Sequence, residues 1–140
     1  LVFRKLSNKN GNIIRKFLDL IKSEANSNNE KAKPFVKQFN YYIDILSKFS
    51  EWTIDKSKTN KDDVSAAAND YLKTLGYVSL AFAWVKVLNI SFKDYKENKK
   101  FYDNKINTAK FYFDKVLPRA EQHYKSAVSG SSNIMNFKFN

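Results

Sequence analysis

Apolar side chains recur along most of this chain at alternating intervals of four and three residues. The longest uninterrupted run consists of Val64, Ala68, Tyr71, Leu75, Val78, Phe82 and Val85. This spacing follows one face of an α-helix, whereas the side chains on one face of a strand recur at every second residue. Only three Gly and two Pro occur in 140 residues, so few turns interrupt the pattern. The sequence therefore predicts a small number of long helices.

Two helices are expected before residue 60. The first covers residues 12–27, and its apolar face is formed by Ile14, Phe17 and Ile21, widened by Ile13 and Leu20. The second begins near Pro34, because proline is tolerated in the first turn of a helix, and fades near Lys58. Its apolar face consists of Phe35, Phe39, Tyr42, Leu46, Phe49 and Thr53.

Two more helices are expected after residue 60. The third opens at Asn60 and Asp63, whose side chains can cap free N–H groups of the first turn. It is the most apolar of the four and is expected to be the most buried. The fourth covers residues 99–128, and Gly130 provides its C-terminal stop.

Two residues break the helical pattern locally. Gly76 lies inside the third helix, where glycine costs up to about 1 kcal/mol relative to alanine, so we expect a close helix crossing there. Pro118 lies inside the fourth helix, where it removes a backbone hydrogen bond and clashes with the preceding turn. We therefore expect a kink near Lys115 and Val116.

Four long helices with short polar connections predict an all-α, up-down antiparallel four-helix bundle over residues 12–130. Residues 1–11 are interpreted as the end of a preceding domain or as a linker. Residues 131–140 are interpreted as a tail, in which Ile134, Met135, Phe137 and Phe139 would dock on another surface if they were ordered.

Composition excludes several classes of site and of location. There is no cysteine, and therefore no disulfide, thiolate metal site or cysteine nucleophile. The longest apolar run, residues 77–85, is far shorter than the ~20 residues of a membrane span, so no span is expected. The chain starts at Leu1 without a signal segment, and we expect a cytoplasmic piece of a longer protein.

The net charge of +11 invites comparison with nucleic-acid-binding proteins. However, only Arg4, Arg15 and Arg119 are arginines, and dedicated DNA readers favour arginine for bidentate contacts to bases. Aromatic residues do alternate with lysines over residues 101–113, as they would on a base-stacking surface. Core packing of Tyr102 and Phe113, flanked by Phe101 and Tyr112, explains this stretch better.

Candidate catalytic groups are few. His123, the single histidine, lies on the apolar face of the fourth helix and is interpreted as a hydrogen-bonded packing residue. Asp44 and Asp70 are either buried acids with raised pKa values or, the favoured interpretation, partners in hydrogen bonds or ion pairs. Asp62 and Asp63 are interpreted as helix-start residues.

Phosphate and metal sites are not expected either. The chain's glycines, Gly11, Gly76 and Gly130, are too far apart to form a phosphate-binding loop. No Glu-x-x-His cluster suggests a metal site. We therefore predict no catalytic residue and no metal ligand in this chain, and cofactor-binding residues remain unassigned.

Two stretches carry a resemblance to a known family. One contains Asn69-Asp70-Tyr71-Leu72, Leu75-Gly76-Tyr77-Val78 and Ala83-Trp84, and the other contains Phe101-Tyr102, Lys105, Thr108-Ala109, Phe111-Tyr112-Phe113 and Val116-Leu117-Pro118. Leu1-Val2 with Arg4-Lys5-Leu6 adds a weaker match. Together they resemble the C-terminal helical extension of acyl-CoA dehydrogenases of the methylmercaptopropionyl-CoA dehydrogenase type. Lys110 departs from that pattern, which has arginine there.

The resemblance implies a parent enzyme that oxidises an acyl-CoA to its 2,3-enoyl form and passes the electrons to FAD. In such enzymes a glutamate removes the α-proton while hydride moves to the flavin. By analogy, that glutamate and the flavin-binding domains would precede Leu1, and residues 1–11 would end the catalytic domain. No catalytic residue can then be assigned to this chain, and FAD is not expected to bind it alone.

The resemblance further implies an accessory role. The domain would cover the catalytic domains of the same polypeptide, shape the acyl-CoA entrance or support a homo-oligomer. Two alternatives stay open. One is a basic nucleic-acid-binding helical module, like a DNA-repair-associated homologue in the same superfamily, and the other is a free-standing adaptor that presents an apolar groove.

Overall fold

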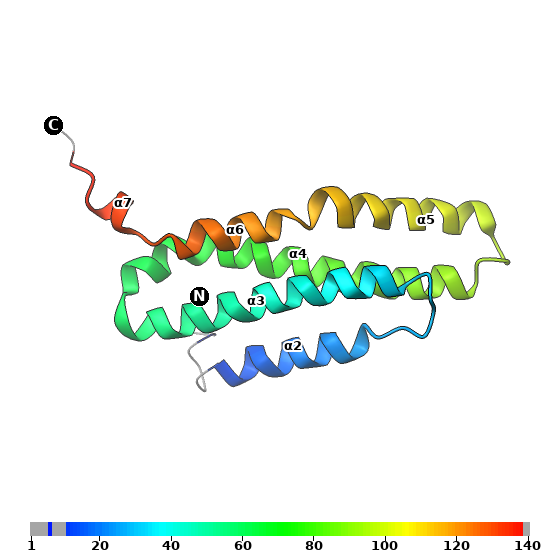
Figure 1. The fold of residues 1–140 in the computed structure, drawn as a ribbon, viewed down its shortest axis with the longest axis horizontal. Coiled ribbons are helices and arrows are strands. Elements are labelled where there is room, and N and C mark those ends of the chain that lie inside the picture. Colours follow the sequence, from blue (N-terminus) through cyan, green and yellow to red (C-terminus); the bar gives the residue numbers. More distant parts are fainter. Residues whose placement is uncertain (1–5, 7–10, 139–140) are drawn as a thin grey trace.

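The computed structural model describes Leu6 and residues 11–138, which form helices joined by short turns, with no strand among them (Figure 1). The helices are α2 (Asn12–Glu24), α3 (Lys33–Thr59), α4 (Lys61–Lys93), α5 (Lys99–Phe111), the π-helix η2 (Tyr112–Val116), α6 (Arg119–Val128) and the single turn α7 (Ser132–Met135). The prediction of an all-helical fold is confirmed. The expectations for Leu1, Val2, Arg4, Lys5 and Phe139 fall outside the described residues.

Helix α4 lies at the centre of the packing. It contacts α3 on one side and the successive segments α5, η2 and α6 on another, and α3 also contacts α6. Helix α2 packs mainly on α3 and lies on the side of α3 away from α5 and α6 (Figure 1). The consecutive long helices alternate in direction (Figure 1). The expected up-down four-helix bundle is not confirmed, because α2 packs so largely on one neighbour.

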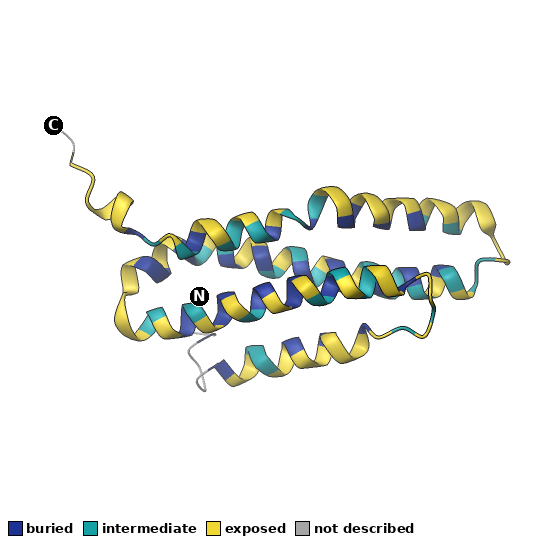
Figure 2. Cartoon of the chain, in the orientation of Figure 1, coloured by how far each residue is buried: buried dark blue, intermediate teal, exposed yellow. Residues whose placement is uncertain are grey.

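The core follows the four-and-three spacing of the sequence (Figure 2). In α3 the buried members of the expected face are Phe39, Tyr42, Leu46, Phe49 and Thr53. The ring of Phe49 is centred 5.1 Å from that of Tyr71 on α4 and 5.4 Å from that of Tyr124 on α6. One aromatic side chain therefore joins three helices. Burial also raises the pKa of the Tyr71 hydroxyl to about 12.

Helix α2 presents a different face from the one expected. Leu18 and Ile21 are its buried residues, while Phe17 is 38% exposed and Leu20 is 56% exposed. The prediction that Phe17 belongs to the buried face is wrong, because α2 meets mainly one neighbour and can bury only a narrow stripe. Two ion pairs, from Arg15 to Glu51 (2.6 Å) and from Lys22 to Asp44 (3.1 Å), add to the contact with α3.

Gly76 faces outward from α4. A Cβ atom placed on it would meet no atom within 4 Å, and the residue is exposed. The expected close crossing at Gly76 is therefore wrong within the described part of the chain. Helix α4 is not buried on all sides, although it was expected to be the most buried helix. Its residues Leu72, Leu80 and Ile90 are each more than half exposed.

The break expected near Lys115 and Val116 is present as a π-helix. The N–H of Leu117 bonds to the carbonyl of Tyr112 at 2.9 Å, five residues back, and Pro118 has no N–H to donate. The carbonyl of Phe113 instead accepts a hydrogen bond from Nε2 of Gln38 on α3, at 3.0 Å. Proline thus ends the regular helix, and a side chain from another helix satisfies the carbonyl.

The expected helix ends are largely confirmed. The Asn60 side chain accepts hydrogen bonds from the N–H groups of Asp62 and Asp63, at 3.1 and 3.2 Å. Gly130 has φ +84° just after α6, the left-handed conformation typical of a C-terminal stop. In the tail, Ile134, Met135 and Phe137 are each at least 60% exposed, so none of the three is buried in the core.

Helix α4 is long and apolar enough, by length and composition alone, to cross a membrane. An 18-residue window in it has a mean hydropathy of 1.5, and 28% of that window is buried. Core helices of soluble proteins share these properties, and α4 is the central packing helix here. The absence of a membrane span therefore stays a prediction.

Candidate functional site

The chain's histidine sits in a small polar cluster between α4 and α6. Nδ1 of His123 lies 2.7 Å from Oδ1 of Asp70, and the ring of Tyr77 stacks on the imidazole with centroids 5.9 Å apart. All three side chains are half-buried. The favoured interpretations of His123 and Asp70, as hydrogen-bonded residues inside the helical assembly, are confirmed.

This cluster lacks the other components of a hydrolytic site. An acid that orients a histidine needs a nucleophile on the other ring nitrogen to form a triad. Among the described residues, no serine or threonine hydroxyl is hydrogen-bonded to His123. The arrangement therefore ties α4 to α6 and offers no activated nucleophile.

The remaining candidate acids are structural. Asp44 is exposed and pairs with Lys22, so the interpretation as a buried acid does not hold and the ion-pair interpretation is confirmed. Asp62 lies in the first turn of α4, as expected, and so does Asp63.

Asp63 has a further role that the sequence did not indicate. Its buried Oδ1 accepts hydrogen bonds from the backbone N–H of Ser131 at 2.8 Å and from the Ser131 hydroxyl at 2.7 Å. Nζ of Lys56 lies 3.1 Å from Oδ2. The bonds from Ser131, aided by the bond from Lys56, hold the pKa of the Asp63 carboxyl below its usual range. A bond between residues this far apart leaves no local sequence signal.

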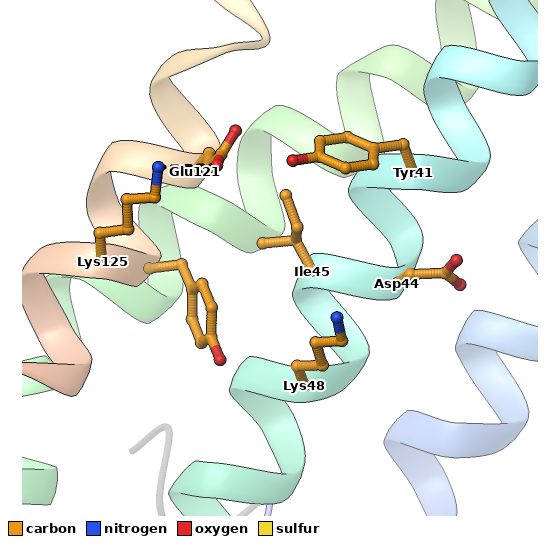
Figure 3. A pocket seen from close by; sticks show the side chains of 7 residues that line it. Tyr41, Asp44, Ile45, Lys48, Glu121 and Lys125 are labelled. Atoms are coloured by element: carbon orange, nitrogen blue, oxygen red, sulfur yellow. Dashed lines mark ion pairs between the residues drawn. The ribbon is translucent and has the colours of Figure 1, made fainter.

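A polar hollow of about 240 Å³ lies between α3 and α6 (Figure 3). Its lining residues are Tyr41, Asp44, Ile45, Lys48, Glu121, Tyr124 and Lys125. Glu121 pairs with Lys125 at 2.9 Å, and this bond lowers the pKa of the Glu121 carboxyl. Both acids in the lining are ion-paired, Asp44 with Lys22 and Glu121 with Lys125, so neither is free to act as a general acid or base.

A second, more open hollow of about 420 Å³ lies at the start of α3 and is lined by Pro34, Lys37, Gln38, Tyr41 and Tyr42. Dinucleotides such as FAD are held through their pyrophosphate by a glycine-rich turn at a helix N-terminus. Neither hollow is lined by a glycine, so neither contains a turn of this kind. Within the described residues no three His, Asp or Glu side chains gather into a group that could hold a metal ion.

The aromatic stretch of residues 101–113 divides between core and surface. Phe113 and Tyr112 are buried, and the Tyr112 hydroxyl donates to the carbonyl of Tyr77 at 2.7 Å. Phe101 and Phe111 are 49% and 61% exposed. Tyr102, which was expected in the core, is half-buried. Core packing therefore explains Tyr112 and Phe113 and leaves the rings of Phe101 and Phe111 on the surface.

Comparison with protein families settles the class of this chain. The model of the family described as acetyl-CoA dehydrogenase C-terminal like matches residues 12–138. The chain belongs to that family. The match begins at the first residue of α2 and extends past α7, so the family domain includes the whole described helical assembly from α2 onward. No curated protein and no solved structure matches the chain. The family resemblance inferred from the sequence is confirmed, while its methylmercaptopropionyl-CoA dehydrogenase branch is not distinguished.

Proposed function

We propose that this chain is the C-terminal accessory domain of an FAD-dependent acyl-CoA dehydrogenase of the methylmercaptopropionyl-CoA dehydrogenase type. The parent enzyme would oxidise an acyl-CoA to the 2,3-enoyl-CoA, with FAD as the electron acceptor. The family match over residues 12–138 is the observation that carries this proposal.

The chemistry of the described residues supports an accessory rather than a catalytic role. The histidine is engaged with an acid and lacks a bonded nucleophile, and the acids of the polar hollow are ion-paired. FAD and the proton-abstracting glutamate would belong to upstream domains of the same polypeptide. Those domains would be the main partner of this one, and a homo-oligomer is expected for the parent.

Two measurements test this proposal. The first is the genomic sequence before Leu1, which should encode flavin-binding dehydrogenase domains. The second compares the 140-residue chain with the full-length gene product for flavin absorbance and for formation of enoyl-CoA from acyl-CoA. Both signals are expected from the full-length protein and neither from the chain alone. Tight binding of FAD by the chain alone would contradict the proposed division of labour.

A basic nucleic-acid-binding module is the second candidate, and one surface feature favours it. On α5 the exposed rings of Phe101 and Phe111 accompany Lys100, Lys105 and Lys110, and Nζ of Lys105 lies 5.2 Å from the centre of the Phe101 ring. Exposed rings between lysines suit stacking on single-stranded bases. Binding of a single-stranded oligonucleotide that weakens steeply with salt, and is lost in Phe111→Ala, would support this function. No mobility shift at low salt would eliminate it.

A further inference from the structure

The outward face of α4 is apolar along most of its length. Its members are Leu72, Gly76, Leu80, Ala83, Val87 and Ile90, spaced by four, four, three, four and three residues, and we call them the outer α4 stripe. Leu72 is 57% exposed, and Leu80 and Ile90 are each 54% exposed. At 1.5 Å per residue the stripe is about 27 Å long. Single exposed leucines are ordinary, but a continuous apolar row indicates an interaction surface.

Gly76 adds a reason to expect a helix against this stripe. Glycine weakens a helix relative to alanine, and an L side chain would fit at this position because no atom lies within 4 Å of the Cβ site. The packing inside the chain therefore does not require glycine. A glycine on an exposed apolar face does allow a second backbone to approach closely.

The charged side chains that α4 itself places beside the stripe are lysines. From Tyr71 to Lys93, α4 contains no acidic residue and contains Lys73, Lys86 and Lys93. At 100° per residue, Lys73 lies on one side of the stripe and the other two lysines lie on the other side. Lys86 pairs with Glu24 of α2 at 2.6 Å, whereas Lys73 and Lys93 form no ion pair with any described residue. Glu24 thus balances the charge of Lys86, and Asp94 follows Lys93 at the end of the helix. The stripe is apolar along its centre and has one lysine without an ion pair to a described residue on each side, Lys73 and Lys93.

We propose that the outer α4 stripe is a docking surface for an amphipathic helix whose apolar face is flanked by acidic residues. Charge complementarity selects this occupant, because glutamates on both sides of such a helix would face Lys73 and Lys93. A second copy of this chain fits less well, since it would bring the same lysine-edged surface and a net charge of +11 against itself. The proposal does not depend on the parent being a flavoenzyme.

A designed peptide supplies the direct test. Its sequence would form a helix of about 20 residues, the length of the stripe, with leucines on one face and glutamates on both sides of them. Binding of the 140-residue chain would be followed by fluorescence anisotropy of the labelled peptide. We expect binding that is at least about tenfold tighter than that of a matched peptide with lysines in place of the glutamates, and that weakens with salt. Equal binding of the two peptides, or no binding of the glutamate peptide, would overturn the proposal.

Two variants locate the peptide on the stripe. Leu80→Lys places a charge in the centre, and Gly76→Leu fills the space through which a second backbone would approach. Each should weaken binding about tenfold or more while circular dichroism shows unchanged helix content. Phe111→Lys on α5, an equally exposed position outside the stripe, should leave binding unchanged. Loss of binding in Phe111→Lys with none in Leu80→Lys would contradict the assignment.

The alternative occupants give distinct results. Sedimentation of the chain at high protein concentration should show a monomer, and a dimer abolished by Leu80→Lys would show that the stripe binds a second copy. Leu80→Lys should bind vesicles of anionic lipid at least as well as the wild type does. Weaker binding of this variant to the vesicles would show that the stripe is a membrane-binding surface, and the helix-docking proposal would fail.

Discussion

Gln38 on α3 donates a hydrogen bond from its side-chain amide to the backbone carbonyl of Phe113, the second residue of the π-helix, at 3.0 Å. That carbonyl has no backbone donor because the Leu117 N–H is bonded to Tyr112 and Pro118 has none to give. A half-buried carbonyl without a donor is costly. The amide of Gln38 therefore compensates for the presence of Pro118, 80 residues later in the chain.

Replacing Gln38 by alanine should destabilise the protein. The carbonyl of Phe113 would lose its donor, which typically costs about 1–3 kcal/mol in the free energy of unfolding. Urea denaturation followed by circular dichroism measures this change. Gln122→Ala, at an exposed glutamine on α6, should change the free energy of unfolding by less than about 0.5 kcal/mol.

The link to proline can be tested by a double-mutant cycle. Pro118→Ala restores a backbone N–H five residues after Phe113, which is a suitable donor for its carbonyl in a π-helix. The cost of Gln38→Ala should then be smaller in the Pro118→Ala background than in the wild type. Identical costs in both backgrounds would show that the two residues act independently.

Gly76→Ala should stabilise the protein by about 0.5–1 kcal/mol. Alanine is the better helix former, and the added Cβ meets no atom within 4 Å. Thermal or urea unfolding of the purified chain measures the gain. A loss of stability would contradict this prediction.

Phe49→Ala should be among the most destabilising single substitutions. The ring is fully buried and contacts the rings of Trp52, Tyr71 and Tyr124, so its removal opens a cavity at the junction of three helices. Such substitutions cost about 3–5 kcal/mol in the free energy of unfolding. The matched control is Phe111→Ala, where the ring is 61% exposed and the cost should be below about 0.5 kcal/mol.

Asp63 should make the stability of the chain depend on pH in the acid range. Its bonds to Ser131 and Lys56 lower the pKa of its carboxyl in the folded state. The stabilisation is therefore complete above the pKa of an unfolded aspartate, near 3.9, and is lost as the pH falls through the lower folded-state pKa. In Asp63→Asn, the deficit in free energy of unfolding relative to the wild type should be largest near neutral pH and should shrink below about pH 4. A deficit that does not change with pH would show that the charge of Asp63 contributes nothing.

The helices were predictable because each carries its own periodic signal. The buried residues of α3 and α4 keep the four-and-three spacing, but in α4 every second member shifts by one residue, so that Ala67, Thr74 and Ala81 are buried and Ala68, Leu75 and Phe82 are half-buried. The caps at Asn60 and Gly130 depend on residues next to the helix ends. Pro118 likewise marks the break in the last long helix through its own covalent structure. These features need no knowledge of tertiary contacts.

The predictions that failed concern residues whose burial depends on which helix packs against them. Helix α2 is apolar on more than one side, and only its packing on α3 selects Leu18 instead of Phe17 for burial. The sequence around Gly76 does not show whether a helix that packs closely against it belongs to the same chain or to another one. The hydrogen bonds from Ser131 to Asp63 and from Gln38 to the carbonyl of Phe113 join residues far apart in the chain, so they depend on the tertiary fold.

The connection between α3 and α4 has a consequence for folding kinetics. Asn60 is the single residue between these two helices of 27 and 33 residues. Closing so short a connection costs little chain entropy, and the contacts it brings together are close in sequence near the joint. We therefore expect contacts between α3 and α4 to form early in folding, first near Asn60 and then progressively further from it. Helices α5 and α6, and then α2, would pack on this pair later.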